Sequence, residues 1–238
     1  MNNILKKINL VAISAAVSMA AFTNIVSAGA PASTKILTAN FESRKVVQVE
    51  AGDFHFVPGQ VAPIHTHSAP AIGYVVKGEI IYQVEGEKQL LLKEGDAFFE
   101  PVGPRILRFD NASATEEAIF IDFNLEQAGE PFIVFESAPT EAIDRRTLPT
   151  TSLSGKALSQ AGIYSTDLAA GDTTNITVAQ PTFGIVAKGI VVLKSKDGKT
   201  QRVSEGATFA LTKVNSSVSL SNGSSEVPAK VITFKMKQ

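Results

Sequence analysis

The chain has 238 residues, with 22 lysines and arginines against 23 aspartates and glutamates, and its formal net charge is −1. No basic run stands out, so the sequence argues against a nucleic-acid surface and against a polybasic membrane patch. The absence of cysteine excludes disulfides and a lipid-modified cysteine.

The first 28 residues have the pattern of a secretory signal peptide. Lys6 and Lys7 precede an apolar run over residues 10–22, and Val26-Ser27-Ala28 supplies small residues for cleavage. The apolar run is shorter than the about 20 residues that a membrane span needs, and no later run approaches that length. We therefore expect an exported protein, periplasmic or secreted, without a membrane anchor.

After this segment the chain reads as strands throughout. Short runs rich in Val, Ile and Phe recur between Gly, Pro and Asn or Asp, and no long stretch has a helical period. Spacing of this kind is typical of an antiparallel sandwich or barrel. The runs cover residues 46–49, 54–57, 72–76, 80–84, 90–92, 97–99 and 119–123.

The chain also repeats itself at a constant offset of 111 residues. Gly73 corresponds to Gly184, and Phe123 corresponds to Phe234, with no gap between these positions. We interpret this as two copies of one β domain. The predicted division is a first domain over residues 40–136, a linker over 137–162 that contains Pro139 and a Thr/Ser cluster, and a second domain over 163–238.

The tripeptide His65-Thr66-His67 holds two of the three histidines in the chain. On a strand, residues i and i+2 point to the same face, so both imidazoles lie side by side. Two neighbouring imidazoles are a common part of a metal site. The alternative is that both histidines are polar residues lining a pocket that holds no metal.

The first copy resembles the cupin superfamily over residues 45–125. The residues that carry this resemblance fall at the spacing of the two cupin motifs: Gly59, His65, His67 and Gly78 for the first, and Gly95, Pro101, Gly103 and Asp110 or Asn111 for the second. Two usual metal ligands are missing, because Ala71 stands in the Glu position and Ile106 in the second-motif His position. The resemblance implies an all-β fold of two tandem cupin-type (jelly-roll) barrels, the second degenerate.

The resemblance also suggests a replacement ligand. The segment around Glu100-Pro101 is similar to a cupin subgroup whose second motif carries Glu-Pro, where this Glu is an alternative ligand. The predicted site is then His65, His67 and Glu100, a ligand set that suits one divalent ion of iron, manganese, nickel or zinc. The alternatives are an empty degenerate site, or a rim carboxylate at Glu100 that pairs with Arg105 or Arg108.

Two further residues are predicted to bind substrate. Arg108 shares strand parity with position 106, so it is a candidate for binding an acidic substrate or for pairing with Glu100, with a solvated arginine as the alternative. Tyr74 is the second candidate, with core packing as the alternative.

The second copy lacks all three candidate ligands. At the repeat offset, His65, His67 and Glu100 correspond to Ile176, Val178 and Leu211, which cannot bind a metal. We therefore predict a structural or dimer-forming role for the second copy.

Three functions remain open from the sequence. The first is a metal-dependent enzyme that oxygenates, decarboxylates or isomerises a small organic molecule. The second is a non-catalytic exported protein that binds a small molecule in its barrel, and the third is a structural bicupin. A homodimer that pairs through the apolar run over residues 132–135 is an expected assembly.

Overall fold

The computed structural model describes residues 31–155 and 157–238, and these form twenty strands and no helix. The predicted signal peptide lies outside the described residues. None of the described elements is a helix long and apolar enough to span a membrane. The prediction of an all-β fold is confirmed.

The strands form four sheets. Sheet I contains, in spatial order, β10 (Val134–Phe135), β3 (His65–Thr66), β8 (Ile106–Asn111), β5 (Glu79–Val84) and β6 (Leu90–Lys93). Sheet II contains β11 (Asp144–Thr147), β2 (Gln48–Phe56), β9 (Ala118–Glu126), β4 (Ala71–Lys77) and β7 (Ala97–Glu100), with β12 (Thr151–Ser152) also paired to β2.

The other two sheets come mainly from the second half of the chain. Sheet III contains β1 (Ser33–Lys45), β13 (Ala157–Leu168), β20 (Ala229–Lys237), β15 (Thr182–Lys188) and β18 (Thr208–Leu211). Sheet IV contains β14 (Thr173–Val178), β19 (Ser216–Asn222), β16 (Ile190–Ser195) and β17 (Thr200–Ser204). We refer to sheets I and II as the first sheet pair and to sheets III and IV as the second.

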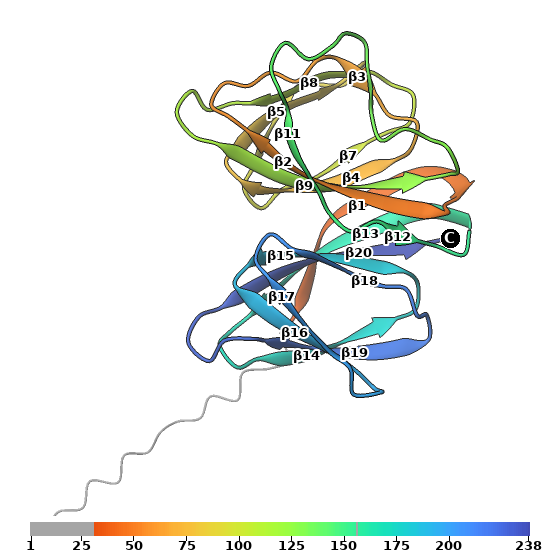
Figure 1. The fold of residues 1–238 in the computed structure, drawn as a ribbon, viewed down its shortest axis with the longest axis vertical. Helices are drawn as coiled ribbons and strands as arrows, with labels where there is room; N and C mark the ends of the chain where they lie inside the picture. The colour runs from red at the N-terminus through yellow and green to blue at the C-terminus, as the bar shows by residue number, and fades with distance from the viewer. Residues whose placement is uncertain (1–30, 156) are drawn as a thin grey trace, which may run out of the picture.

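The four sheets stack as successive layers with an apolar core between each two neighbours (Figure 1). Strand alternation produces this arrangement in sheet II, since Phe120 faces sheet I whereas Ile121 and Phe123 face sheet III. Phe123 packs against Phe183 and Phe234 of sheet III, with ring centroids 5.6 and 4.9 Å apart. The two sheet pairs therefore share one continuous central core.

The strand bounds differ from the predicted division of the chain. β1 begins at Ser33, before the predicted start at residue 40, and it pairs with β13 of the second sheet pair. In return β11 and β12, from the predicted linker, pair with β2 of the first sheet pair, and β13 also begins inside that linker. The second sheet pair thus contains an edge strand, β1, from the segment that precedes the first. The first sheet pair contains an edge strand, β11, from the segment that precedes the second.

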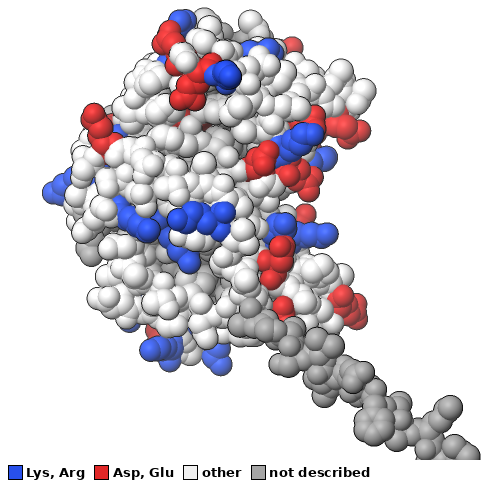
Figure 2. Space-filling model, turned by 180° about the vertical axis from the view of Figure 1, so that it is seen from behind, with Lys and Arg blue, Asp and Glu red and all other residues white. Residues whose placement is uncertain are grey.

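The internal repeat is also visible in side-chain contacts. The amide nitrogen of Asn111 donates to the carbonyls of Phe56, Val57 and Glu116, and that of Asn222 donates to Leu168, Ala169 and Val227. Each asparagine thus closes a loop onto a neighbouring strand in the same way. Figure 2 shows that charged side chains on the rear face gather in small groups separated by uncharged surface, some of both signs and some, as in the row across the middle, of Lys and Arg alone.

Candidate metal centre

His65 and His67 lie at the open end of the first sheet pair, where the short strand β3 joins sheet I. Both residues are 3% exposed. His65 Nδ1 lies 2.8 Å from the carbonyl oxygen of Pro63. Because a carbonyl only accepts, Nδ1 carries the proton and donates it, which leaves His65 Nε2 with a free lone pair when the ring is neutral.

The third group is Glu100, at the end of β7 and also 3% exposed. Its Oε1 lies 3.5 Å from His65 Nε2, and its Oε2 lies 3.3 Å from His67 Nε2. The structure therefore brings the three predicted ligands together, and their ligand atoms all lie within 4.8 Å of one another. Glu100 pairs with neither Arg105 nor Arg108, so the alternative of a rim salt bridge is wrong.

Strand register explains how the site survives the loss of two usual ligands. Ala71 is the direct cross-strand partner of Glu100, so the carboxylate has moved from one strand to its neighbour and the small alanine leaves room for it. Ile106 is the cross-strand partner of His65, is fully buried and belongs to the apolar core between sheets I and II. At the position of the usual second-motif histidine, this chain thus has an apolar side chain that packs in the core.

Several buried polar atoms of the site have no hydrogen-bond partner among the residues that the structure describes. They are Nδ1 and Nε2 of His67 and Oε1 of Glu100. Nε2 of His67 and Oε1 of Glu100 face the site, whereas Nδ1 of His67 lies on the other side of its ring. Buried polar atoms are almost always paired, so the two that face one point indicate an absent binding partner. Separations of 3.3–3.5 Å fit adjacent ligands of one ion whose bonds are about 2.1 Å long. The residues present fit a divalent transition metal.

The charges of the site act on one another strongly. Burial alone raises the pKa of Glu100, but the adjacent His67 and His65 outweigh it and lower that pKa to about 2. Burial lowers the pKa of His65, yet Glu100 and the Pro63 carbonyl raise it above its usual value overall. In the metal-free protein, Glu100 is therefore a carboxylate that holds a proton on a neighbouring imidazole.

Asp122 is a fourth polar group of this site, and the sequence analysis missed it. It lies on β9, is 2% exposed, and lines the same cavity as the three candidate ligands. Its cross-strand partners are Gly52 and Gly73, over which the rings of Phe54, Phe132 and Phe98 pack. Burial and the charge of Glu100 raise the pKa of Asp122 to about 8. The sequence signal was an aspartate at an inward position of an otherwise apolar strand.

The two predicted substrate-binding residues are not at the cavity. Arg108 is half-exposed and donates to Asp110 and Gln89, 2.7 and 3.1 Å away. A register shift in the pairing of β5 with β8 falls between Ile106 and Arg108, and it reverses the strand parity on which the prediction relied. Tyr74 faces the core between sheets II and III, because alternation on β4 points it away from the site.

The cavity itself is small and apolar apart from these four groups. It has a volume of about 30 Å³, which is room for about two water molecules. Its walls are aromatic and aliphatic side chains from both sheets and from the segment after β9: Phe54, Phe56, Ala62, Phe109, Phe120, Phe132, Ile133, Phe135 and Ile143.

Comparison with known proteins agrees with this geometry. Residues 52–124 match the family model described as Cupin domain. The chain is similar in structure to AerE from Microcystis aeruginosa, with a TM-score of 0.57, 14% identity, and coverage of 86% of this chain and 99% of that chain. No curated protein matches the sequence.

A second similar structure is salicylate 1,2-dioxygenase from Pseudaminobacter salicylatoxidans, with a TM-score of 0.55, 16% identity, and coverage of 80% of this chain and 72% of that chain. A structure of its adducts with gentisate gives a TM-score of 0.55, 16% identity and coverage of 79% and 68%. At these identities the likeness is one of fold. Residues 52–124 therefore form a cupin domain, and the chain shares the fold of these two proteins.

Proposed function

We propose that this protein is an exported, metal-dependent cupin enzyme that oxidises a small aromatic molecule with dioxygen. The observation that carries the proposal is the buried convergence of His65, His67 and Glu100 around unpaired polar atoms. Two histidines and one carboxylate are the ligand set of non-haem iron oxygenases, which leave positions open for substrate and dioxygen. Manganese, nickel and zinc are the other ions that this donor set accepts.

The residues of the chain have distinct tasks in this proposal. His65, His67 and Glu100 would hold the metal, which supplies Lewis-acid and redox chemistry when bound. Asp122 Oδ1 has no hydrogen-bond partner among the described residues, so this carboxyl group is placed to hold a proton for a substrate oxygen. The aromatic walls exclude water and favour a flat apolar ligand.

Similar structures support the substrate class within the proposal. The salicylate 1,2-dioxygenase and its gentisate adduct show that one protein of this fold acts on, and binds, small aromatic acids. In the present chain Arg145 is a cation beside the cavity, outside its lining and paired with Glu50. Its guanidinium carbon lies 3.7 Å from the ring centroid of Phe132, which lines the cavity, and its charge lowers the pKa of Asp122.

We also propose that residues 157–238, with β1, form a degenerate second cupin barrel. The constant repeat offset and the matching hydrogen bonds of Asn111 and Asn222 support this. Ile176 and Val178 are buried apolar residues at the positions of His65 and His67. Export through residues 1–28, to the periplasm or beyond, is part of the same proposal. A homodimer is also part of the proposal. Its contact surface is not assigned, because β10, which lies in the apolar run over residues 132–135, already pairs with β3 of its own chain.

Metal content tests the proposal. The mature chain is purified from its exported fraction, and iron, manganese, nickel and zinc are measured by mass spectrometry beside His67→Ala and Glu100→Gln. The matched control is Val178→Ala, at the equivalent position of the second sheet pair. About one ion per chain, lost in the first two variants only, supports the site, and oxygen uptake with salicylate and gentisate then tests the chemistry. No metal even after incubation with excess ions would end the enzyme proposal.

A structural cupin protein without a small-molecule ligand is the second candidate, and one observation favours it. The cavity of about 30 Å³ is far smaller than the about 300 Å³ at which ordinary ligand pockets begin. A protein that takes up no metal and binds no aromatic acid would favour this candidate.

A further inference from the structure

The cavity at the candidate metal centre is covered by one short segment, residues 127–136, which we call the strap. We propose that the strap opens to admit the ligand, and that Arg145 and Asn124 hold it closed. The inference rests on the proposed function only for the identity of that ligand. Opening itself is a property of the metal-free chain and can be measured without a metal or a substrate.

The strap supplies one side of the cavity. Phe132, Ile133 and Phe135 line it opposite the sheet residues, and the His65 and Phe135 rings lie 5.9 Å apart, edge to face. A space of about 30 Å³ cannot accept a benzene ring, so any organic ligand requires these side chains to leave. Separating sheets I and II would cost much more free energy, because it would expose the apolar core that the two sheets share.

The middle of the strap is held by two side chains from sheet II. The amide nitrogen of Asn124 donates to the carbonyl oxygen of Phe132. The guanidinium of Arg145 lies over the Phe132 ring, with its central carbon 3.7 Å from the ring centroid, and also pairs with Glu50. A cation over an aromatic face at this range is attractive, and more so where water is excluded.

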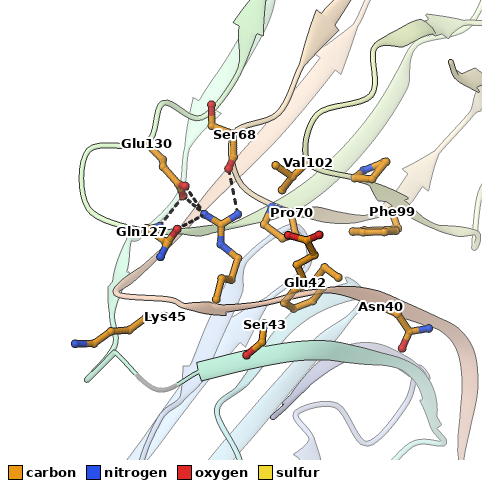
Figure 3. Close-up of a pocket in the computed structure, with 13 residues that line it drawn as sticks. Asn40, Glu42, Ser43, Lys45, Ser68, Pro70, Phe99, Val102, Gln127 and Glu130 are labelled. Carbon is orange, nitrogen blue, oxygen red and sulfur yellow. Dashed lines mark hydrogen bonds and ion pairs between the residues drawn. The ribbon is translucent and has the colours of Figure 1, made fainter.

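The beginning of the strap is held by Arg44, which comes from β1 of the second sheet pair. This arginine lines a groove of about 870 Å³ and contacts three residues there, Ser68, Gln127 and Glu130, which Figure 3 labels. It pairs with Glu130, lies 3.3 Å from Oε1 of Gln127, and donates to the Ser68 carbonyl at 3.1 Å. Ser68 directly follows His67, so Arg44 joins the strap to the loop that carries a candidate ligand.

The far end of the strap is held more weakly. Val134 and Phe135 pair with Thr66 and His65 as the two-residue strand β10, and the amide of Glu136 donates to the Ile64 carbonyl at 2.9 Å. Beyond it, Glu136 pairs with Arg105 at 2.6 Å, and both side chains are more than one third exposed. Exposed ion pairs stabilise a fold only weakly, so the end at β10 is the one that releases first. Segments with few paired backbone groups open at low free-energy cost.

A reversible lock tests the proposal. The chain has no native cysteine, so a pair introduced as Thr66→Cys and Val134→Cys can form only one disulfide. These residues are direct antiparallel partners, whose Cα separation of about 4.5–5.5 Å suits a disulfide. Both side chains point away from the cavity, because Thr66 alternates with His65 and His67. The control pair is Thr173→Cys with Ser221→Cys, partners on β14 and β19.

Opening is measured as the rate at which diethyl pyrocarbonate modifies His65 and His67 in metal-free protein, resolved by peptide mass spectrometry. His55, the third histidine, lies outside the cavity and serves as the internal reference. We expect at least a tenfold slower reaction of His65 and His67 in the oxidised lock. Reduction and alkylation of the thiols should restore the rate, and the oxidised control pair should match wild type. Equal rates in the oxidised lock and in wild type would overturn the proposal.

A single substitution gives a second, independent test. Arg145→Ala removes the cation over Phe132 and should speed modification of His65 and His67 several-fold, with His55 unchanged. Arg146→Ala is the matched control, since Arg146 is exposed and pairs only with Asp144 among the described residues. An Arg145→Ala rate equal to that of wild type would contradict the assigned role. If the protein takes up no metal even from excess ions but its strap behaves as proposed, the strap proposal stands and only the enzyme function is rejected.

Discussion

The two sheet pairs share a scaffold and differ in their interiors. Asn111 and Asn222 make corresponding hydrogen bonds, and Gly73 and Gly184 each lie beneath a phenylalanine ring, Phe98 and Phe209. In contrast, the four polar groups of the first cavity correspond at the repeat offset to Ile176, Val178, Leu211 and Thr233. The residues that shape the backbone were kept in both copies, whereas the buried chemistry is present in one. Buried polar groups are costly without a binding partner, so their joint loss is what a structural copy should show.

The largest expected difference between the copies is in metal affinity. His67→Ala should lower the affinity for a divalent transition metal by about 100-fold or more, because even residues that only support a ligand contribute 10–100-fold. Val178→Ala should leave the affinity unchanged. Isothermal titration with zinc and with iron(II) under anaerobic conditions measures both. A similar affinity in the two variants would mean that the ion binds elsewhere.

The copies should also differ in how pH affects stability, because only the first interior titrates. The folded pKa of Asp122, about 8, lies above its usual 3.8, so its contribution is complete below 3.8 and is lost as pH rises through 8. The pKa of His65 is likewise raised above 6.5, and its contribution is lost in the same direction. Glu100 has its pKa lowered from 4.5 to about 2, so its contribution is present above 4.5 and is lost as pH falls towards 2.

Metal-free protein should therefore be most stable at about pH 4, between the ordinary pKa values of Asp122 (3.8) and Glu100 (4.5), and should lose stability from there towards pH 9. Asp122→Asn should flatten this decline, and Thr233→Asn, the matched control in the second copy, should not. Urea unfolding at pH 5, 7 and 9 measures the profiles. It is the slope with pH that matters, and parallel slopes for wild type and Asp122→Asn would contradict the assignment.

The shared scaffold should respond equally in both copies. Asn111→Ala and Asn222→Ala each leave three carbonyls without their donor, which should lower the free energy of unfolding by about 2–3 kcal/mol. The two values should agree within about 1 kcal/mol. Urea unfolding monitored by circular dichroism gives both values. A large cost in one copy alone would show that the repeat is not maintained by equivalent contacts.

The smallest expected effect is at Arg108. Its side chain is half-exposed and bound to Asp110, so Arg108→Ala should change metal affinity and aromatic-acid binding by less than about twofold. Ser219→Ala, at the corresponding position of the second copy, should behave in the same way. Equilibrium titration with salicylate checks this. A tenfold loss on Arg108→Ala would mean that the arginine turns inward when a ligand binds.

The sequence by itself determined the strand content, the repeat and three of the four polar residues of the site. Period-two alternation and motif spacing are local signals, and they place His65, His67 and Glu100 on the inner face of one sheet pair without knowledge of distant contacts. The spacing of the two motifs also identified Ala71 and Ile106 correctly as positions that hold no ligand.

The tertiary structure decided what depends on pairing between distant strands. A single register shift near Ile106 turned Arg108 outward, and alternation on β4 placed Tyr74 in the central core. Asp122 joined the site because the pairing of β9 with β4, and of β4 with β7, brings it to the same cavity as Glu100. The exchange of β1 against β11 and β12 is likewise a long-range choice. Local pattern specifies which face of a strand is apolar, whereas register and partner are fixed only when the sheets pack.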